Sequence, residues 1–246
     1  MAEDRWHVLD RTLPGVAANL ALDELLLQDA EEGDGRPTLR LWELPDHAVV
    51  LGASGRWRDE IHWEACRADG VPIARRSSGG GTVVIGPGAL NVAVVLPDDF
   101  ATGLGAVDVA QHYVLGRIAD ALRTLGPPVE VRGSGDLTLG LRKVSGSAQR
   151  RLKRSFLVHA TILYDFDLPL ITRYLKSPAR QPSYRAGRPH DEFVTNLEMS
   201  GESLLNAVRS AWLPPGGEVG EPAVSMSRID ELVASKFGDP AWVERL

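Results

Sequence analysis

Two short stretches of this chain combine residue types that could bind a phosphate. The first runs over residues 75–82 and reads Arg-Arg-Ser-Ser-Gly-Gly-Gly-Thr. Three consecutive glycines carry no side chains, so successive backbone N–H groups can turn toward one anion and a phosphate can approach the main chain closely. The second stretch, 143–149, reads Lys-Val-Ser-Gly-Ser-Ala-Gln. Because Arg76 could add fixed cationic charge as a planar fork and Lys143 as a mobile point charge, the two stretches together indicate a nucleotide site.

Taken alone, neither stretch is specific. The glycines do not end in Gly-Lys-Ser/Thr, as a P-loop does. They are contiguous and no helical pattern follows them, so they do not match the dinucleotide fingerprint either. A flexible surface turn is the alternative interpretation of the glycine stretch, and a solvated lysine at a strand end is the alternative for Lys143.

Composition restricts the class of protein. The chain has 246 residues, of which 43% are hydrophobic and 24% charged, as in ordinary globular proteins. Its first residues lack the basic start and apolar run of a signal peptide, and no stretch approaches the roughly 20 apolar residues of a membrane span, so we expect a cytoplasmic protein without a membrane partner. A single cysteine, Cys66, excludes an internal disulfide and a cysteine-built metal site. The net charge of −6 argues against general nucleic-acid binding.

Alternating strand and helix patterns predict a mixed α/β (α+β) architecture. Strands are expected over 38–42, 48–51 and 71–74, over a pair 82–85 and 89–96 bent at Gly86-Pro87-Gly88, and over a second pair 143–149 and 156–164. Helices are expected over 19–30, 63–69, 107–125, 168–175, 204–212 and 227–236, the last capped by Ser227. Residues 214–222 are predicted to be a flexible connector. We expect one domain over 1–246 with a short helical extension from about residue 200 and no separate accessory domain.

The two phosphate-binding stretches belong to an ordered series of motifs that resembles the lipoate-protein ligase A family. The matching segments are 18–24, 49–52, 75–83, 90–91, 136, 143–149, 159–163 and 194–197. The arginine and glycine block followed by Lys-x-x-Gly-x-Ala-Gln is typical of a wider group that also holds biotin ligases and octanoyltransferases. The resemblance implies a mixed β-sheet flanked by helices, of the biotin/lipoate ligase catalytic-domain type.

The resemblance also implies a reaction. A ligase of this family joins a fatty-acid-like carboxylate to the α-phosphate of ATP and passes the acyl group to one lysine of a carrier domain, so ATP, Mg²⁺ and lipoate are expected ligands. Lys143 is the implied catalytic residue, placed between carboxylate and α-phosphate, where it stabilises charge without transferring a proton. The implied nucleotide-binding residues are Arg76, Gly79, Gly80, Gly81, Thr82, Val83, Gly146 and Ala148.

Other residues are implied to contact the acyl substrate or a metal ion. The implied acyl and substrate site consists of Arg75, Ser78, Asn91, Ser147 and His159. His159 lies between apolar residues in the middle of a predicted strand, so a satisfied core histidine is its alternative interpretation. Asp136 could hold Mg²⁺ that bridges phosphate oxygens, with an ordinary turn residue as its alternative.

Two departures from the ligase pattern leave alternatives open. The Gly86-Pro87-Gly88 turn looks closer to octanoyltransferases, which resemble one another in holding the acyl group on a cysteine. In the best-known class that cysteine follows the lysine motif, where this chain reads Lys-Ser-Pro-Ala over 176–179. Cys66 lies upstream on a predicted helix, where a buried structural thiol is expected. The second departure is length, because only about 50 residues follow Asn196, fewer than the accessory domain of full ligases.

The sequence therefore favours an ATP-dependent lipoate-protein ligase, which could require a separate accessory subunit. An ATP-independent octanoyl or lipoyl transferase is one alternative, and a non-catalytic acyl or acyl-adenylate binding protein, or a subunit of a bipartite ligase, is another. Basic residues gather near the proposed site, at 142, 143, 150, 151, 153 and 154 and then at 173, 176, 180, 185 and 188. They predict a docking surface for an acidic lipoyl carrier domain, with a solvated hairpin and loop as the alternative. No aromatic platform accompanies them, so we expect no nucleic-acid partner.

Overall fold

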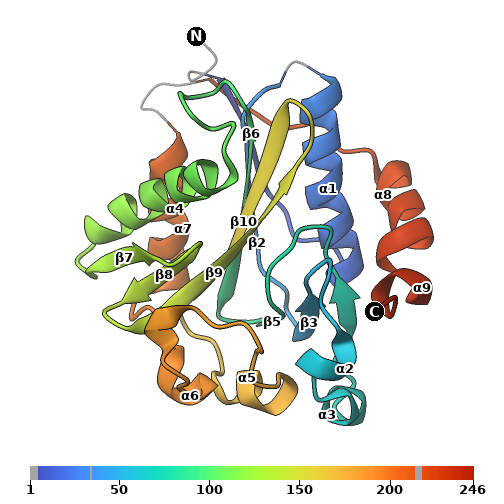
Figure 1. Cartoon of the computed structure of the whole chain (residues 1–246). Helices are drawn as coiled ribbons and strands as arrows, with labels where there is room; N and C mark the ends of the chain where they lie inside the picture. Colours follow the sequence, from blue (N-terminus) through green and yellow to red (C-terminus); the bar gives the residue numbers. More distant parts are fainter. Residues whose placement is uncertain (1–4, 34, 214–217) are drawn as a thin grey trace.

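A large mixed β-sheet forms the centre of the molecule in the computed structural model, which describes residues 5–33, 35–213 and 218–246. Within these residues the sheet has eight strands in the order β11-β1-β2-β6-β10-β9-β8-β7 (Figure 1). Their bounds are β1 Arg5–Asp10, β2 Thr38–Trp42, β6 Ala89–Pro97, β7 Val129–Arg132, β8 Asp136–Leu139, β9 Arg142–Arg151, β10 Ser155–Leu163 and β11 Glu218–Gly220. Strand β1 runs parallel to β2 and β11, and the other neighbours are antiparallel. The predicted mixed sheet is confirmed.

A second, three-stranded sheet has the order β4-β3-β5, with bounds β3 Ala48–Leu51, β4 Ile73–Arg75 and β5 Val83–Ile85. The predicted pairing of 82–85 with 89–96 is therefore wrong, because β5 pairs with β3 while β6 pairs with β2 and β10. Gly88 explains the separation. It has φ +80°, and a Cβ there would lie 2.2 Å from the carbonyl carbon of Asp165. The turn is held against a distant segment and directs the chain from one sheet to the other.

Helices cover both faces of the large sheet (Figure 1). One face packs against α4 Val107–Arg123 and α7 Gly201–Trp212, and the other against α1 Val16–Glu32 and the C-terminal α8 Met226–Leu232. Side chains alternate along β10, so Val158 joins the core under α4 while Leu157 joins the core under α1. The same alternation puts His159 and Thr161 on the α1 side, where the functional cavities lie.

Shorter helices surround the small sheet and the lower end of β9. These are α2 Trp57–Glu60, α3 Trp63–Ala68, α5 Pro169–Tyr174, a 3₁₀ turn Ser183–Arg185, α6 His190–Phe193, a π-helical turn Val233–Phe237 and α9 Pro240–Val243. In the part of the chain that the structure describes, no helix is long and apolar enough to cross a membrane.

Several boundaries differ from the predictions. The last long helix is capped by Ser225, whose Oγ accepts from the backbone N–H of Arg228 at 3.4 Å, so the predicted Ser227 cap is wrong. Of the predicted connector, residues 214–217 lie outside the described residues, and Glu218–Gly220 form edge strand β11. Asp136 begins β8, which corrects its interpretation as a turn residue.

Candidate active site

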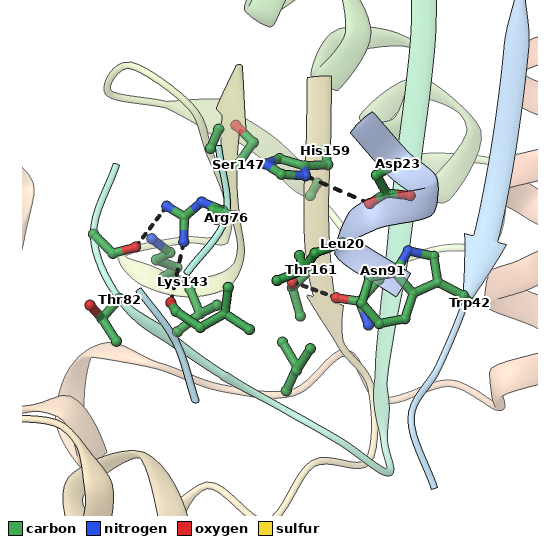
Figure 2. A pocket seen from close by; sticks show the side chains of 17 residues that line it. Leu20, Asp23, Trp42, Arg76, Thr82, Asn91, Lys143, Ser147, His159 and Thr161 are labelled. Atoms are coloured by element: carbon green, nitrogen blue, oxygen red, sulfur yellow. Dashed lines mark hydrogen bonds and ion pairs between the residues drawn. The ribbon is translucent and has the colours of Figure 1, made fainter. Parts of the chain in front are cut away.

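Two cavities meet next to the glycine-rich loop, and Lys143 lines both of them. The inner cavity, of about 110 Å³, lies between α1, the small sheet and the large sheet (Figure 2). Its apolar walls are Leu20, Trp42, Val50, Val83 and Ile85. The outer cavity, of about 450 Å³, is bounded by the glycine loop, β9 and the segment 176–194. The two cavities share Gly81, Thr82, Val83, Lys143, Gly146, Ser147 and Thr161.

Lys143 is held at this junction by an acidic partner. Its Nζ lies 2.6 Å from Oδ1 of Asp136, and the hydroxyl of Tyr184 donates to Oδ2 of the same carboxylate at 2.6 Å. Burial and the neighbouring carboxylate raise the pKa of Tyr184 far above its usual value, so it stays a donor. A Cβ at Gly146 would lie 2.7 Å from the lysine Nζ, so only glycine leaves the ammonium this position.

Arg76 lies beneath the glycine loop. Its guanidinium is 6% exposed and donates to the carbonyls of Gly79 at 2.5 Å and Gly81 at 2.8 Å, to that of Val50 at 3.3 Å and to Oγ of Ser78 at 3.0 Å. Burial lowers its pKa to about 10, so the group remains cationic at neutral pH. Arg76 therefore shapes the loop and places positive charge beneath it (Figure 2).

A glycine at the end of β3 lets the loop lie this close. A Cβ at Gly52 would fall 2.1 Å from the carbonyl oxygen of Gly80, so a side chain at this position would push the loop away from the small sheet. The loop backbone is thus fixed by Arg76 on one side and by the bare surface of Gly52 on the other.

A chain of buried polar groups connects the inner cavity to the same loop. Ser78 Oγ accepts from Nε of Arg76, and it lies 2.5 Å from Nε2 of His159. Nδ1 of His159 is 3.9 Å from Oδ2 of Asp23, whose other oxygen accepts from Arg40 at 2.5 Å. His159 thus lines the inner cavity, as a substrate contact would, and also has polar partners, as a satisfied core histidine does.

The structure places Arg75 away from both cavities, which departs from the expectation of an acyl contact. Its guanidinium donates to the carbonyls of Gly52 at 2.9 Å, Gly55 at 2.7 Å and Val243 at 2.7 Å. Nε1 of Trp242 donates back to the carbonyl of Arg75. Successive side chains of an extended segment point to opposite sides, so Arg75 fastens the C-terminal segment while Arg76 faces the loop.

The remaining predicted residues divide by location. The inner cavity is lined by Arg76, Gly81, Thr82, Val83, Asn91, Lys143, Gly146, Ser147, Ala148 and His159. Gly80 and Asp136 line the outer cavity, whereas Ser78 and Gly79 line neither and act through Arg76.

Three of the cavity residues are fixed by hydrogen bonds of their own. Ser147 Oγ donates to the carbonyl of Gly135 at 2.7 Å and so holds the turn before Asp136. Asn91 Oδ1 accepts from Thr161 at 2.9 Å, and Thr82 donates to Glu60 at 2.5 Å.

The structure offers little to a metal ion by itself. Among the described residues no group of three or more His, Cys, Asp or Glu side chains is arranged to hold one. Both carboxylate oxygens of Asp136 already have partners. Proteins commonly bind Mg²⁺ through one or two carboxylates together with substrate phosphates. Asp136 therefore fits Mg²⁺ only as one ligand of an ion that arrives with a nucleotide.

Sequence reasoning missed several cavity residues. Leu20, Trp42 and Ile85 look like ordinary core residues, and Arg185 is part of a Pro- and Arg-rich loop without a pattern. Tyr184, from the same loop, lines neither cavity and acts through Asp136. The one available signal was the excess of basic residues in that loop. Cys66 is 0% exposed on α3 and lines neither cavity, and burial raises the pKa of its thiol.

Comparison with known proteins identifies the family of the chain. The family model described as the lipoyl protein ligase A/B catalytic domain matches residues 16–210. A protein of Aeropyrum pernix provisionally named lipoate-protein ligase A is 39% identical over 155 residues, which cover 63% of this chain but only 56% of that relative. The octanoyltransferase LipM of Moorella thermoacetica is 28% identical over the full length of both chains.

Solved structures share the fold. A protein of the bipartite lipoate protein ligase of Thermoplasma acidophilum, described with its E2 lipoyl domain, has a TM-score of 0.82 at 23% identity and covers 98% of this chain and 96% of its own. A lipoate-protein ligase A bound with ATP has the same TM-score at 24% identity and covers 98% and 100%. Because the family model spans most of the residues and the site lies within it, this chain belongs to the lipoyl protein ligase A/B catalytic domain family.

Proposed function

We propose that this protein is an ATP-dependent lipoate-protein ligase, which activates lipoate or a similar medium-chain acid as acyl-AMP and transfers the acyl group to a lysine of a lipoyl carrier domain. The position of Lys143 carries the proposal, because its ammonium lies where a narrow cavity with apolar walls opens into a wider cavity lined by cations. An acyl chain suits the inner cavity and a nucleotide suits the outer one. The carboxylate and the α-phosphate would then meet at Lys143.

The residues supply electrostatic stabilisation. A carboxylate oxygen of the acid attacks the α-phosphorus, an acyl–phosphate bond forms, and pyrophosphate leaves with the electrons of the broken P–O bond. Lys143 would leave Asp136 to neutralise charge on the carboxylate and the phosphorus, with no proton transferred. Mg²⁺, when bound with ATP, would neutralise phosphate charge beside Asp136. The neutral amine of the carrier lysine then attacks the acyl carbon and an amide forms. AMP leaves with the electron pair of the acyl C–O bond, and the amine proton passes to the leaving phosphate or to water.

Two observations favour an ATP-independent octanoyl or lipoyl transferase as the second candidate. The full-length relative from Moorella thermoacetica is named an octanoyltransferase, and the turn at 86–88 reads Gly-Pro-Gly. Covalent transfer through a thioester, however, needs an accessible thiol. The single cysteine of the chain, Cys66, is buried and lines neither cavity, which supports the ligase over a thioester route.

The proposal includes a protein partner. The Thermoplasma acidophilum neighbour is described as part of a bipartite ligase with a lipoyl domain. We propose the same two partners, an accessory subunit and a lipoyl carrier domain, for this chain. Cationic side chains at 176, 180 and 185 line the outer cavity, which would favour the approach of an acidic carrier domain at low salt. An accessory subunit would be supplied separately.

Lipoate-dependent exchange of labelled pyrophosphate into ATP tests the proposal. We expect exchange that requires lipoate and that occurs without any added carrier domain. Failure to exchange, combined with octanoyl transfer from an acyl-carrier thioester, would replace the ligase by the transferase. Tight lipoyl-AMP binding with neither reaction, even with an accessory subunit, would leave a binding protein.

A further inference from the structure

Four arginines are buried among the described residues, and one of them differs from the rest. Arg40 is paired with the carboxylate of Asp23. Arg75 and Arg76 each donate to four or more carbonyl or hydroxyl oxygens. Arg185 is 3% exposed, yet within the described residues its guanidinium has one acceptor, the carbonyl of Arg188 at 2.8 Å from Nε. Its Nη2 is buried without a partner.

The guanidinium of Arg185 is held in place against an aromatic ring. Its Cζ lies 4.7 Å from the ring centroid of Phe193, and the ring of Tyr184 packs on Phe193 at 5.4 Å. No carboxylate of the described residues lies within ion-pair distance of Arg185. A buried charge without a counter-ion is costly, and an anionic ligand bound beside it would offset that cost.

Arg185 also lines the outer cavity, together with Lys143, Lys176 and Arg180. His190 lines the same cavity, with its Nε2 3.2 Å from the carbonyl oxygen of Lys176. Burial lowers the pKa of His190, and the charges of Arg185 and Lys143 lower it further. The acids that line the cavity among the described residues are Glu60 and Asp136.

Both of these acids have partners elsewhere. Glu60 accepts from Thr82 and from the backbone of Arg56, and Asp136 accepts from Lys143 and Tyr184. Neither carboxylate therefore compensates the charge of Arg185, and no other acid of the described residues lines the cavity.

We propose that Arg185 forms the centre of a phosphate-binding subsite in the outer cavity, which takes the pyrophosphate portion of ATP opposite the junction at Lys143. The planar fork of arginine suits two phosphate oxygens, and stacking on Phe193 fixes its plane before the ligand arrives. The proposal rests on the proposed function for the source of the phosphate. In the transferase alternative the same subsite would take the phosphate of a phosphopantetheine arm.

Titration calorimetry and thermal unfolding with inorganic pyrophosphate test the subsite without requiring catalysis. Arg185→Met should weaken pyrophosphate binding at least about tenfold, because it removes a bidentate charged contact. The affinity of Arg185→Lys for pyrophosphate should lie between those of Arg185→Met and the native protein, since lysine retains the charge but lacks the planar fork. Arg150→Met is the matched control, because Arg150 is exposed on β9 and lines neither cavity.

Thermal unfolding separates binding from a structural role. Without ligand, Arg185→Met should melt at or above the Tm of the native protein, since it removes an uncompensated buried charge, and pyrophosphate should no longer raise its Tm. Equal pyrophosphate affinity in the native protein and Arg185→Met would overturn the subsite. If lipoate-dependent pyrophosphate exchange were intact in that case, the ligase proposal would still stand.

The second possible source of the bound phosphate, a phosphopantetheine arm, is tested with an acyl carrier that bears this arm in place of pyrophosphate. Carrier binding that depends on Arg185, with no pyrophosphate exchange, would retain the subsite and reject the ligase. A native protein that binds neither pyrophosphate nor the phosphopantetheine carrier would overturn the subsite.

Discussion

The inner and outer cavities are built from different kinds of structure. The inner one lies between α1 and strands of both sheets, so its walls are side chains that also belong to the hydrophobic core. The outer one is enclosed largely by the glycine loop and by the loop and short helices of segment 176–194. Apart from Lys143 on β9, its cations Lys176, Arg180 and Arg185 lie on that segment and not on the core. Under the proposed function, core packing would set the length of the acyl chain, whereas loop conformation and charge would set anion binding.

Loss of the junction should have the largest effect, because Lys143 serves both cavities. Lys143→Met should lower lipoate-dependent pyrophosphate exchange by about 10²–10³-fold, as expected when one preorganised charge donor is removed from a transition state. Exchange kinetics measure this loss. Lys153→Met, at an exposed lysine of the same hairpin, should leave exchange unchanged. Retained exchange in Lys143→Met would remove the assigned role.

A change confined to the inner cavity should affect only the acid. Leu20 lines the inner cavity and not the outer one, and Leu20→Phe should raise the KM for lipoate about tenfold because the larger side chain would fill space that the acyl chain needs. The KM for ATP should stay within about twofold. Leu20→Ala should widen the range of acids toward longer chains, and steady-state kinetics over a series of chain lengths would show this. A parallel rise in the KM for ATP would contradict separate cavities.

A change at Tyr184, whose hydroxyl holds the cavity residue Asp136 from behind, should have a smaller effect, and on ATP instead of on the acid. Tyr184→Phe removes the hydrogen bond to Asp136, whose carboxylate would then hold Lys143 more tightly. Loss of about 1 kcal/mol of transition-state stabilisation by Lys143 should lower kcat/KM for ATP about fivefold and leave lipoate affinity unchanged. Tyr113→Phe on α4 is the control, because its hydroxyl contacts Arg117 outside both cavities. An unchanged kcat/KM would show that Tyr184 does not influence the lysine.

The smallest effect on activity is expected for the cysteine. Cys66→Ala should leave both exchange and acyl transfer within about twofold, because the thiol is buried and its raised pKa keeps it protonated at neutral pH. The free energy of unfolding should fall by about 1 kcal/mol through lost packing. Denaturant unfolding and transfer assays measure the two quantities. Loss of transfer alone would restore the thioester route.

The same contrast explains what sequence could predict. Alternation predicts β2 to the residue, a short apolar run that ends at Gly52 predicts β3 to the residue, and the glycine and lysine motifs identify most of the junction. The inner cavity gives no local signal, since Leu20 and Trp42 look like any core residues until α1 and β2 are packed together. Very short strands such as β11 offer too few residues for a periodic pattern.

The sequence mispredicts strand pairing and side-chain direction at places where the chain contacts a distant segment. The strand at 83–85 pairs with β3 of the small sheet, and the turn that follows it packs through Gly88 on Asp165, a contact between segments far apart in the chain. Arg75 and Arg76 are adjacent and identical in type, and only the position of Trp242 and Val243 determines which of them faces away from the loop.

The most direct test of the central claim is a single ligand that should occupy both cavities. A non-hydrolysable lipoyl-sulfamoyl adenosine should bind with a stoichiometry of one, and calorimetric competition should show that it displaces both lipoate and ATP. Its affinity should fall by about 10²-fold in Lys143→Met, because the sulfamate lies where the two cavities meet. An analogue that displaces only one of the two substrates, or that binds Lys143→Met as tightly as the native protein, would contradict the account.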